Sequence, residues 1–405
     1  MSKVKTKRFQ EMDEHGSNLL HEVEIFNTLL SRYNGMPNQG LHEYCLSYLK
    51  DKFDKKPLRA YFSLLLYRYL NHYPVWQTKF TTHDEKLLIT KLPFVFEVVI
   101  TIQYLHNHIL DEKYETKKSN FPRIDQNLIA SNILKETLYL YIDQEITSYL
   151  ATDLGMQLKR CIHELFLCVD IGQYLDKNYN NYSAWKKENT EFSFVNSTFY
   201  DKLAAEAIAE ILAEVQAEIV AKSSFVEAYF RRIYCSNVYF FRCIVEVLEQ
   251  IGGKIENEYV NSLKLFSIQY GFMLQIINDY ADFAYSDDAN ERSMLKLAGK
   301  KSTDFFADLY NFNITLPLIF HLQEGYKRKI EAYLEGGKKR NKLLSLYPTQ
   351  IKQEIVSSGA IHACINISRR LSQFARNQLD LDNPITPLFT DMCEMAFDNK
   401  FYRLF

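Results

Sequence analysis

Glycine and proline are scarce in this chain, and their scarcity limits the folds open to it. The 405 residues include 13 Gly and 9 Pro, which is about 3% and 2% against the usual ~7% and ~5%. A β-rich chain needs turn residues at close intervals, whereas long helices need few. With 47% hydrophobic and 24% charged residues, the chain can also bury a large core. We therefore expect an all-α protein with long helices and few turns.

Charge and cysteine usage exclude several classes of protein. The chain has 48 Lys and Arg against 50 Asp and Glu, whereas domains that bind nucleic acid are strongly basic. Its seven cysteines are scattered and form no C-x-x-C pair, which favours reduced thiols over a disulfide framework. The first residues, MSKVKTKRFQEMDEHG, contain no apolar signal segment, and no uncharged run reaches the ~18–20 residues of a membrane span. These features predict a cytoplasmic protein with no transmembrane segment and no nucleic-acid partner.

Hydrophobic periodicity predicts three particular helices. The segment Leu203–Lys222 places glutamates four residues apart opposite an apolar side, which is typical of an amphipathic helix with one solvated face. The segments Phe94–Leu110 and Leu263–Ala284 are apolar nearly all round and are predicted to be buried helices. Both carry polar side chains at their C-terminal ends, where burial costs free energy unless those groups are used.

The polar ends of the two buried helices carry candidate metal ligands. Residues at i and i+4 share a helix face, so oxygen-bearing side chains at this spacing converge. Carboxylate and amide oxygens suit Mg²⁺, which keeps several waters and bridges to phosphates. Taken alone, each end is equally compatible with ordinary solvated acids. The candidates are Asp111, Glu112 and Glu115 on the first helix and Asn278, Asp279 and Asp282 on the second.

Further short motifs follow one another along the chain. Lys56 and Arg59 form a K-x-x-R pair, Glu97 precedes N-H-I-L-D at 107–111, and Lys117 and Lys118 come next. Then come G-Q-Y-L-D at 172–176, the pair Ser236-Asn237, and L-Q-I-I-N-D-Y-A-D at 274–282. Lys300 and Lys301, T-L-P at 315–317 and S-G-A-I at 358–361 complete the series. Their types and order resemble those of the trans-isoprenyl diphosphate synthases, also called the polyprenyl synthetase superfamily.

The resemblance implies a fold and a domain plan. The fold is all-α, a single large helical bundle around a deep apolar cavity, with two acidic motifs facing each other across it. Residues 41–385 would form this domain, with a helical extension at 1–40, a tail at 386–405 and an insertion with an extra helix at 176–230. A homodimer is the expected assembly.

The resemblance also implies roles for residues at the matching positions. The catalytic set is Asp111, Asp279 and Asp282. The metal ligands are Asn107, Asp111, Glu112, Glu115, Asn278, Asp279 and Asp282, holding roughly three Mg²⁺ ions per active site. The substrate-binding set is Lys56, Arg59, Gln103, Lys117, Lys118, Gln173, Asp176, Gln275, Lys300 and Lys301.

Departures from the family pattern direct the functional interpretation. Asn107 and His108 stand where the family has aspartates, Ile100 stands where it has His or Gln, and Asn278-Asp279 forms an N-D pair of the kind found in terpene cyclases. The first interpretation is therefore a Mg²⁺-dependent class I terpene synthase that ionises an allylic prenyl diphosphate. The alternatives are a prenyltransferase, chain-elongating or using another acceptor, and a non-catalytic regulatory subunit of a prenyl synthase.

Overall fold

The computed structural model describes most of the chain as helices. The described residues are 19–32, 39–54, 57–73, 76, 87–110, 124–150, 152–178, 200–218, 223–252, 257–281, 283, 315–323 and 354–397. No strand occurs among them, and none of their helices is long and apolar enough to cross a membrane. All seven cysteines are described, and all are free thiols. The all-α expectation is confirmed.

The chain divides into two compact units. Unit 1 comprises Met1–Phe166, Cys243–Val260 and Leu381–Leu388, and unit 2 comprises Leu167–Arg242, Asn261–Asp380 and Phe389–Phe405. Four helices have residues in both units: α8 (Thr152–Asn178), α12 (Tyr239–Ile251), α13 (Asn257–Ala281) and α21 (Thr386–Phe397). Each unit is described by itself below.

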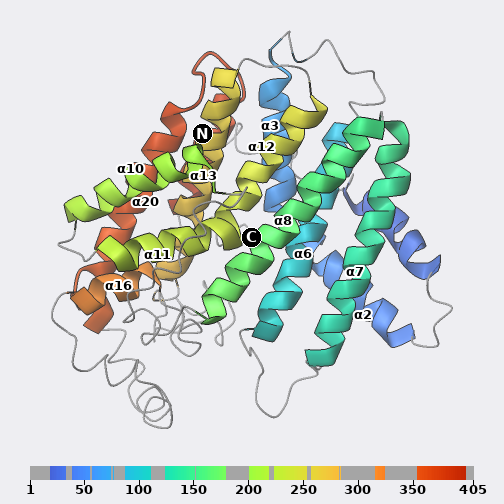
Figure 1. Cartoon of the computed structure of the whole chain (residues 1–405), viewed down its shortest axis with the longest axis horizontal. Helices are drawn as coiled ribbons and strands as arrows, with labels where there is room; N and C mark the ends of the chain where they lie inside the picture. The colour runs from blue at the N-terminus through green and yellow to red at the C-terminus, as the bar shows by residue number, and fades with distance from the viewer. Residues whose placement is uncertain are drawn as a thin grey trace, which may run out of the picture. The chain divides into compact units, whose positions relative to one another are not determined.

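Unit 1 is built around α6. Its other elements are a helix at 19–32, α2 (Gln39–Asp54), α3 (Leu58–Leu70), the π-helix η1 (Leu87–Lys91), α7 (Ile124–Glu145) and the 3₁₀ turn η2 (Thr147–Tyr149). The helix predicted at Phe94–Leu110 is α6 (Leu92–Leu110), and it packs against α2, α3 and α7 (Figure 1). Apolar side chains surround α6 because it has neighbours on several sides, as the sequence predicted.

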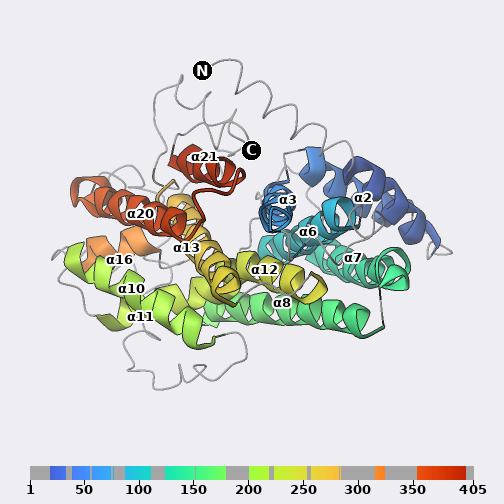
Figure 2. The ribbon, with the colours of Figure 1, turned by 90° about the horizontal axis from the view of Figure 1, so that it is seen from above.

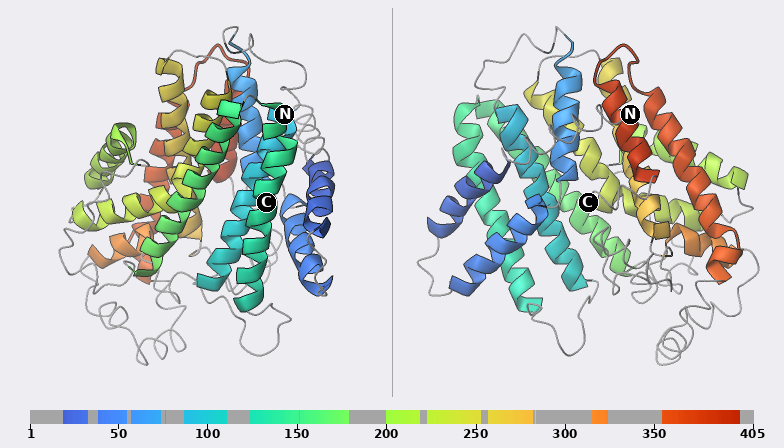
Figure 3. Two further views of the ribbon diagram at one scale, coloured as in Figure 1. Left: turned by 45° about the vertical axis from the view of Figure 1, so that its right-hand side comes forward. Right: turned by 180° about the vertical axis from the view of Figure 1, so that it is seen from behind.

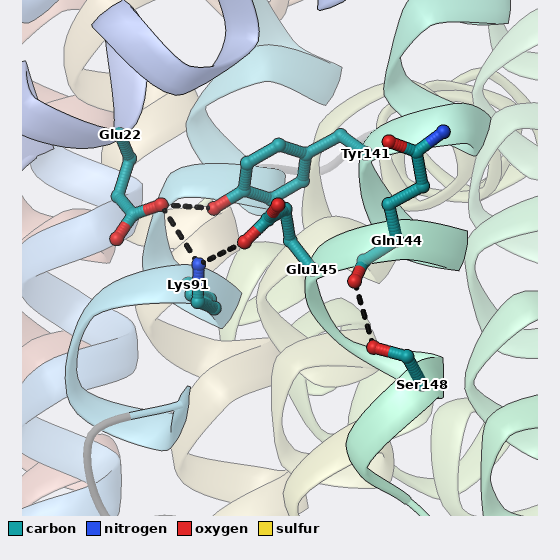
Figure 4. A network of polar contacts seen from close by, with 6 residues as sticks. All are labelled: Glu22, Lys91, Tyr141, Gln144, Glu145 and Ser148. Carbon is teal, nitrogen blue, oxygen red and sulfur yellow. Dashed lines mark hydrogen bonds and ion pairs between the residues drawn. The ribbon is translucent and has the colours of Figure 1, made fainter.

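Within unit 1, a charged network joins the helix at 19–32 to η1 and α7 (Figure 4). Lys91 Nζ lies 3.2 Å from Glu22 Oε2 and 2.9 Å from Glu145 Oε2. The Tyr141 O–H donates to Glu22 Oε2 at 2.5 Å. Glu22 and Tyr141 are buried, and a buried carboxylate requires such partners.

Unit 2 packs α10, α11, α16 and α20 together, with most of α13 (Figure 2). Their bounds are α10 Lys202–Glu218, α11 Ser223–Ile233, α13 Asn257–Ala281, α16 Leu316–Gln323 and α20 Ala360–Asn377, and the π-helix η4 (Tyr234–Val238) joins α11 to α12. Figure 3 shows α20, in red, beside α16, in orange. Gly359, the glycine of S-G-A-I, has φ +80° directly before α20. Glycine adopts this left-handed conformation without the steric cost that other residues meet.

The other predicted helices are present with shifted bounds. The amphipathic helix predicted at Leu203–Lys222 is α10, whose Glu214 pairs with Arg370 of α20. The buried helix predicted at Leu263–Ala284 is α13, which begins earlier, at Asn257. Helix α10 and all but the last three residues of α11 lie in the segment 176–230 predicted as an insertion, and α21 lies in the predicted tail. The domain boundaries and the homodimer stay predictions.

Candidate functional site

Many predicted site residues lie outside the described part of the chain. These are Lys56, Asp111, Glu112, Glu115, Lys117, Lys118, Asp282, Lys300 and Lys301. Asp176 lies in the last turn of α8, but its side chain is not among those described. The roles assigned to these residues stay predictions. The described candidates are Asn107, Arg59 and Gln103 in unit 1, and Gln173, Gln275, Asn278 and Asp279 in unit 2.

In unit 1, Glu97 joins α6 to the start of α3. Its Oε2 accepts hydrogen bonds from the backbone N–H of Arg59 at 3.2 Å and of Ala60 at 3.1 Å. These N–H groups belong to the first turn of α3, where no intrahelical acceptor exists, so Glu97 supplies one from another helix. Burial raises the pKa of Glu97, while the nearby Arg59 opposes that shift.

Two cations gather beside this contact. Arg59 hydrogen-bonds the Tyr104 side chain and is the largest cause that lowers the pKa of Tyr104, against the opposing effect of burial. Lys52 Nζ lies 4.0 Å from the centre of the Tyr104 ring, within the range of a cation–π interaction. Both cations also favour the charged form of Glu97. The predicted substrate-binding Arg59 therefore lies in a cationic cluster made of Lys52, Arg59, Glu97 and Tyr104.

Two further polar side chains lie on the C-terminal half of α6. Gln103 is buried, and its Nε2 has no hydrogen-bond partner among the described residues. His106 Nε2 lies 2.9 Å from Ser131 Oγ of α7, and that hydroxyl donates to the Leu128 carbonyl. Since the hydroxyl proton is used there, we assign the Nε2–H of His106 as the donor. This bond ties the half-buried last turns of α6, with Asn107, to α7.

In unit 2, two glycines bring helices close to η4. A Cβ added at Gly172 of α8 would lie 2.3 Å from the backbone N of Ser236, and one at Gly271 of α13 would lie 3.1 Å from Val238 Cα. The first distance excludes any side chain at Gly172 in this geometry. The G-Q-x-x-D motif and the Ser236-Asn237 pair are thus in direct contact. Asn237 Nδ2 donates to Ser236 Oγ at 2.9 Å, so these two side chains bond to each other.

The last turn of α13 presents two different faces. Asn278 is exposed, whereas Asp279 is buried at 2% exposure. Asp279 Oδ2 accepts from the Tyr229 O–H of α11 at 2.5 Å, and its Oδ1 accepts from Gln275 Nε2 at 2.7 Å. Burial, and then the neighbouring Asp279, raise the pKa of Tyr229 well above its usual value. Tyr229 therefore remains a hydrogen-bond donor at neutral pH.

The donor types fit a hard cation, but the described residues provide few of them. No group of three or more His, Cys, Asp or Glu side chains able to hold a metal occurs in the described ranges. Asn278 offers an exposed amide oxygen, and the acidic partners expected beside it lie outside those ranges. Amide and carboxylate oxygens are the ligands Mg²⁺ prefers.

No family model and no curated protein sequence matches this chain. Solved structures do match. One is described as geranylgeranyl pyrophosphate synthase, with a TM-score of 0.65 and 14% identity over 96% of this chain and 98% of the other. Heptaprenyl diphosphate synthase from Staphylococcus aureus matches with a TM-score of 0.60 and 16% identity over 95% and 98%. This chain has the polyprenyl synthetase fold. The resemblance noted in the motifs is confirmed at the level of the fold.

Another protein with the polyprenyl synthetase fold carries information on ligands. A polyprenyl synthase from Caulobacter crescentus, described as complexed with calcium and isoprenyl diphosphate, matches with a TM-score of 0.57 and 13% identity over 94% of this chain and 97% of that one. The three matches are named as synthases of prenyl chains. The terpene-synthase interpretation is therefore supported only in its class I fold, and the prenyltransferase alternative fits these comparisons better.

Several features of the site went unnoticed in the sequence. The sequence does not single out Tyr229, because nothing local marks a buried tyrosine as the partner of a carboxylate fifty residues away. The π-helix at Tyr234–Val238 was also missed. The available signal was an isolated glycine inside each of two helical patterns, Gly172 and Gly271, since such a glycine commonly marks a close packing contact.

Proposed function

We propose that this chain is a metal-dependent prenyltransferase that elongates an allylic prenyl diphosphate with a second, homoallylic diphosphate such as isopentenyl diphosphate. The observation that carries the proposal is the cationic cluster of Lys52, Arg59, Glu97 and Tyr104. Two cations held against one buried carboxylate suit the diphosphate of an acceptor. An enzyme that only ionises one substrate has no second diphosphate to hold. The near-complete match to prenyl-chain synthases supports the same choice.

Chain residues have three tasks in this mechanism. Arg59 binds the acceptor diphosphate through its guanidinium, and Glu97 keeps Arg59 and the start of α3 in place. Asn278, with the predicted ligand Asp282, would hold Mg²⁺, which when bound would neutralise the leaving diphosphate. Gly172 and Gly271 let α8 and α13 approach η4, so the backbone there is fixed before substrate binds. As the motif resemblance implies, the proposal has roughly three Mg²⁺ ions in the active site.

A terpene synthase is the second candidate. Ile100 of α6 stands where the family has a His or Gln that contacts the second diphosphate substrate. Its side chain is apolar and buried at 7% exposure, so it offers no hydrogen bond to such a substrate. Asn107 and Asn278 are neutral ligands where the family has aspartates. These features are compatible with a site that handles only one diphosphate.

The deciding experiment supplies Mg²⁺ and geranyl, farnesyl or geranylgeranyl diphosphate, each with and without isopentenyl diphosphate. We expect longer prenyl diphosphates and released pyrophosphate only when isopentenyl diphosphate is present. A hydrocarbon or alcohol formed without it would establish the terpene synthase instead. No pyrophosphate in any combination would favour the regulatory-subunit alternative.

Arg59 variants sharpen the same assay. Arg59→Ala should raise the KM for isopentenyl diphosphate by about tenfold or more and leave the KM for the allylic substrate within about twofold, since a lost charge-assisted contact is worth ~1.5–3 kcal/mol. Arg59→Lys keeps the charge and should recover part of the loss. Equal effects on both substrates would contradict an acceptor-specific role.

A further inference from the structure

The Tyr229–Asp279 hydrogen bond lies beside the candidate metal site and has no role in the mechanism above. Tyr229 is fully buried on α11, and its O–H reaches Asp279 Oδ2 at 2.5 Å. The other oxygen of Asp279 accepts from Gln275 one turn earlier on α13. Both carboxylate oxygens are therefore bound by protein donors, and only 2% of the residue is exposed. A metal ligand must instead turn an oxygen toward the ion and its waters.

Asn278 differs from its neighbour in both respects. Successive helical residues point about 100° apart, so fixing Asp279 inward also fixes the direction of Asn278, which is exposed. Asp282 follows Asn278 by four residues in the sequence, the spacing predicted to share a helix face, and lies outside the described residues. The turn thus has an outer face with Asn278 and an inner face with Asp279.

Tyr229 connects this turn to the close backbone contacts of unit 2. The chain runs from α11 directly into η4, and η4 is the segment against which Gly172 and Gly271 pack. The Tyr229 ring also makes an edge contact with Phe230, with centroids 5.1 Å apart. The Tyr229 side chain therefore belongs to a helix that continues into η4, and η4 is fixed by its close contacts with Gly172 and Gly271.

We propose that Tyr229 is a positioning residue for the metal site, and that Asp279 is its anchor rather than a metal ligand. The phenol O–H holds the Asp279 carboxylate inside unit 2 and so sets the direction in which Asn278 presents its amide oxygen. Residues that orient metal ligands from behind typically change metal affinity 10- to 100-fold when mutated. This inference rests on the proposed function and changes the metal role predicted for Asp279.

The test measures Mn²⁺ binding by the full-length protein in the presence of inorganic pyrophosphate, by calorimetry and by the Mn²⁺ paramagnetic resonance signal. Tyr229→Phe keeps the ring and removes the hydrogen bond, and should weaken Mn²⁺ binding by about tenfold. Asp279→Asn keeps an acceptor for Tyr229 and should bind Mn²⁺ within about threefold of the native protein. Asp282→Asn removes a predicted ligand and should lose at least tenfold.

A matched control separates positioning from stability. Tyr141 of unit 1 is also fully buried and donates to a buried carboxylate, Glu22, at the same 2.5 Å (Figure 4). Tyr141→Phe should lower the thermal midpoint about as much as Tyr229→Phe while leaving Mn²⁺ binding native. If Tyr229→Phe also binds Mn²⁺ normally, the positioning role is wrong.

The remaining outcomes are equally decisive. If Asp279→Asn loses as much affinity as Asp282→Asn, Asp279 is a direct ligand and the inference is overturned. If the native protein binds no Mn²⁺ with pyrophosphate, the proposed function fails and the inference fails with it. Native binding with an unaffected Tyr229→Phe overturns the inference alone.

Discussion

The two units hold their candidate binding elements by different interactions. Unit 1 uses charged side chains. Lys91 lies between Glu22 and Glu145, and Glu97 of α6 accepts hydrogen bonds from the first turn of α3. Unit 2 has a buried carboxylate of its own, Asp279, but in addition it places η4 against two glycines, Gly172 and Gly271, with almost no space between the backbones. Charged contacts depend on partner and pH, whereas close backbone contacts depend on volume alone. The two units should therefore fail under different substitutions.

The largest expected effect is in the charged network of unit 1. Lys91→Met removes the cation from Glu22, whose side chain is 3% exposed, and leaves a buried carboxylate without its ion pair. Such a loss costs about 3–5 kcal/mol of unfolding free energy, measurable by urea unfolding. In the control, Lys50→Met breaks the ion pair between Lys50 and Glu24, whose side chains are 43% and 59% exposed. This loss should cost less than about 1 kcal/mol. Similar losses in the two variants would show that burial does not govern the network.

The next effect is steric and belongs to unit 2. Gly172→Ala places a Cβ 2.3 Å from a backbone nitrogen, which cannot move as a flexible side chain can. We expect a loss toward the upper end of the ~1–3 kcal/mol typical of overpacking, or more. Gly271→Ala, whose Cβ would lie 3.1 Å from Val238 Cα, should lose less. Thermal unfolding ranks the pair, and the reverse order would contradict the geometry of η4.

A smaller effect is the pH dependence that Glu97 of unit 1 gives to stability. Burial raises the pKa of Glu97, so the folded protein binds this proton more tightly than the unfolded chain does. The stability that results is fully present below the unfolded pKa of Glu97 and is lost as pH rises through its raised folded pKa. Glu97→Gln cannot titrate, so its thermal midpoint should fall less than that of the native protein as pH rises from about 4 to about 7. Parallel midpoint curves for the two proteins would refute this account of Glu97.

The sequence predicts the helices of both units better than their contacts. Apolar periodicity is local information, and it located α6, α10 and α13 to within a few residues at most ends. The start of α13 was missed because its first residues, Asn257–Ser262, include few apolar side chains, so no periodicity marks it. The helical content and the fold resemblance could likewise be predicted from composition and motif order.

The directions of the site side chains could not be predicted in the same way. The four-residue spacing predicts that Asn278 and Asp282 share one helix face. It cannot predict the hydrogen-bond partner of Asp279, because Tyr229 lies fifty residues away in the chain. Gly172 was recognised as part of a motif, yet the reason for a glycine is the backbone of Ser236. Both facts depend on packing between helices, which sequence spacing does not contain.

The smallest expected effect concerns a half-exposed ion pair of unit 2. Arg370 of α20 pairs with Glu214 of α10 at 2.6 Å, with side chains 31% and 32% exposed. Water reaches both groups and weakens their attraction, so a double-mutant cycle of Arg370→Ala and Glu214→Ala should give a coupling energy of about 0.2–1 kcal/mol. Because this pair joins α10 to α20, its coupling measures how far the packing of these two helices relies on charge. A coupling of about 3 kcal/mol or more, as large as the loss expected for Lys91→Met, would show that this half-exposed pair stabilises unit 2 as strongly as the buried network stabilises unit 1, and that exposure does not separate the two.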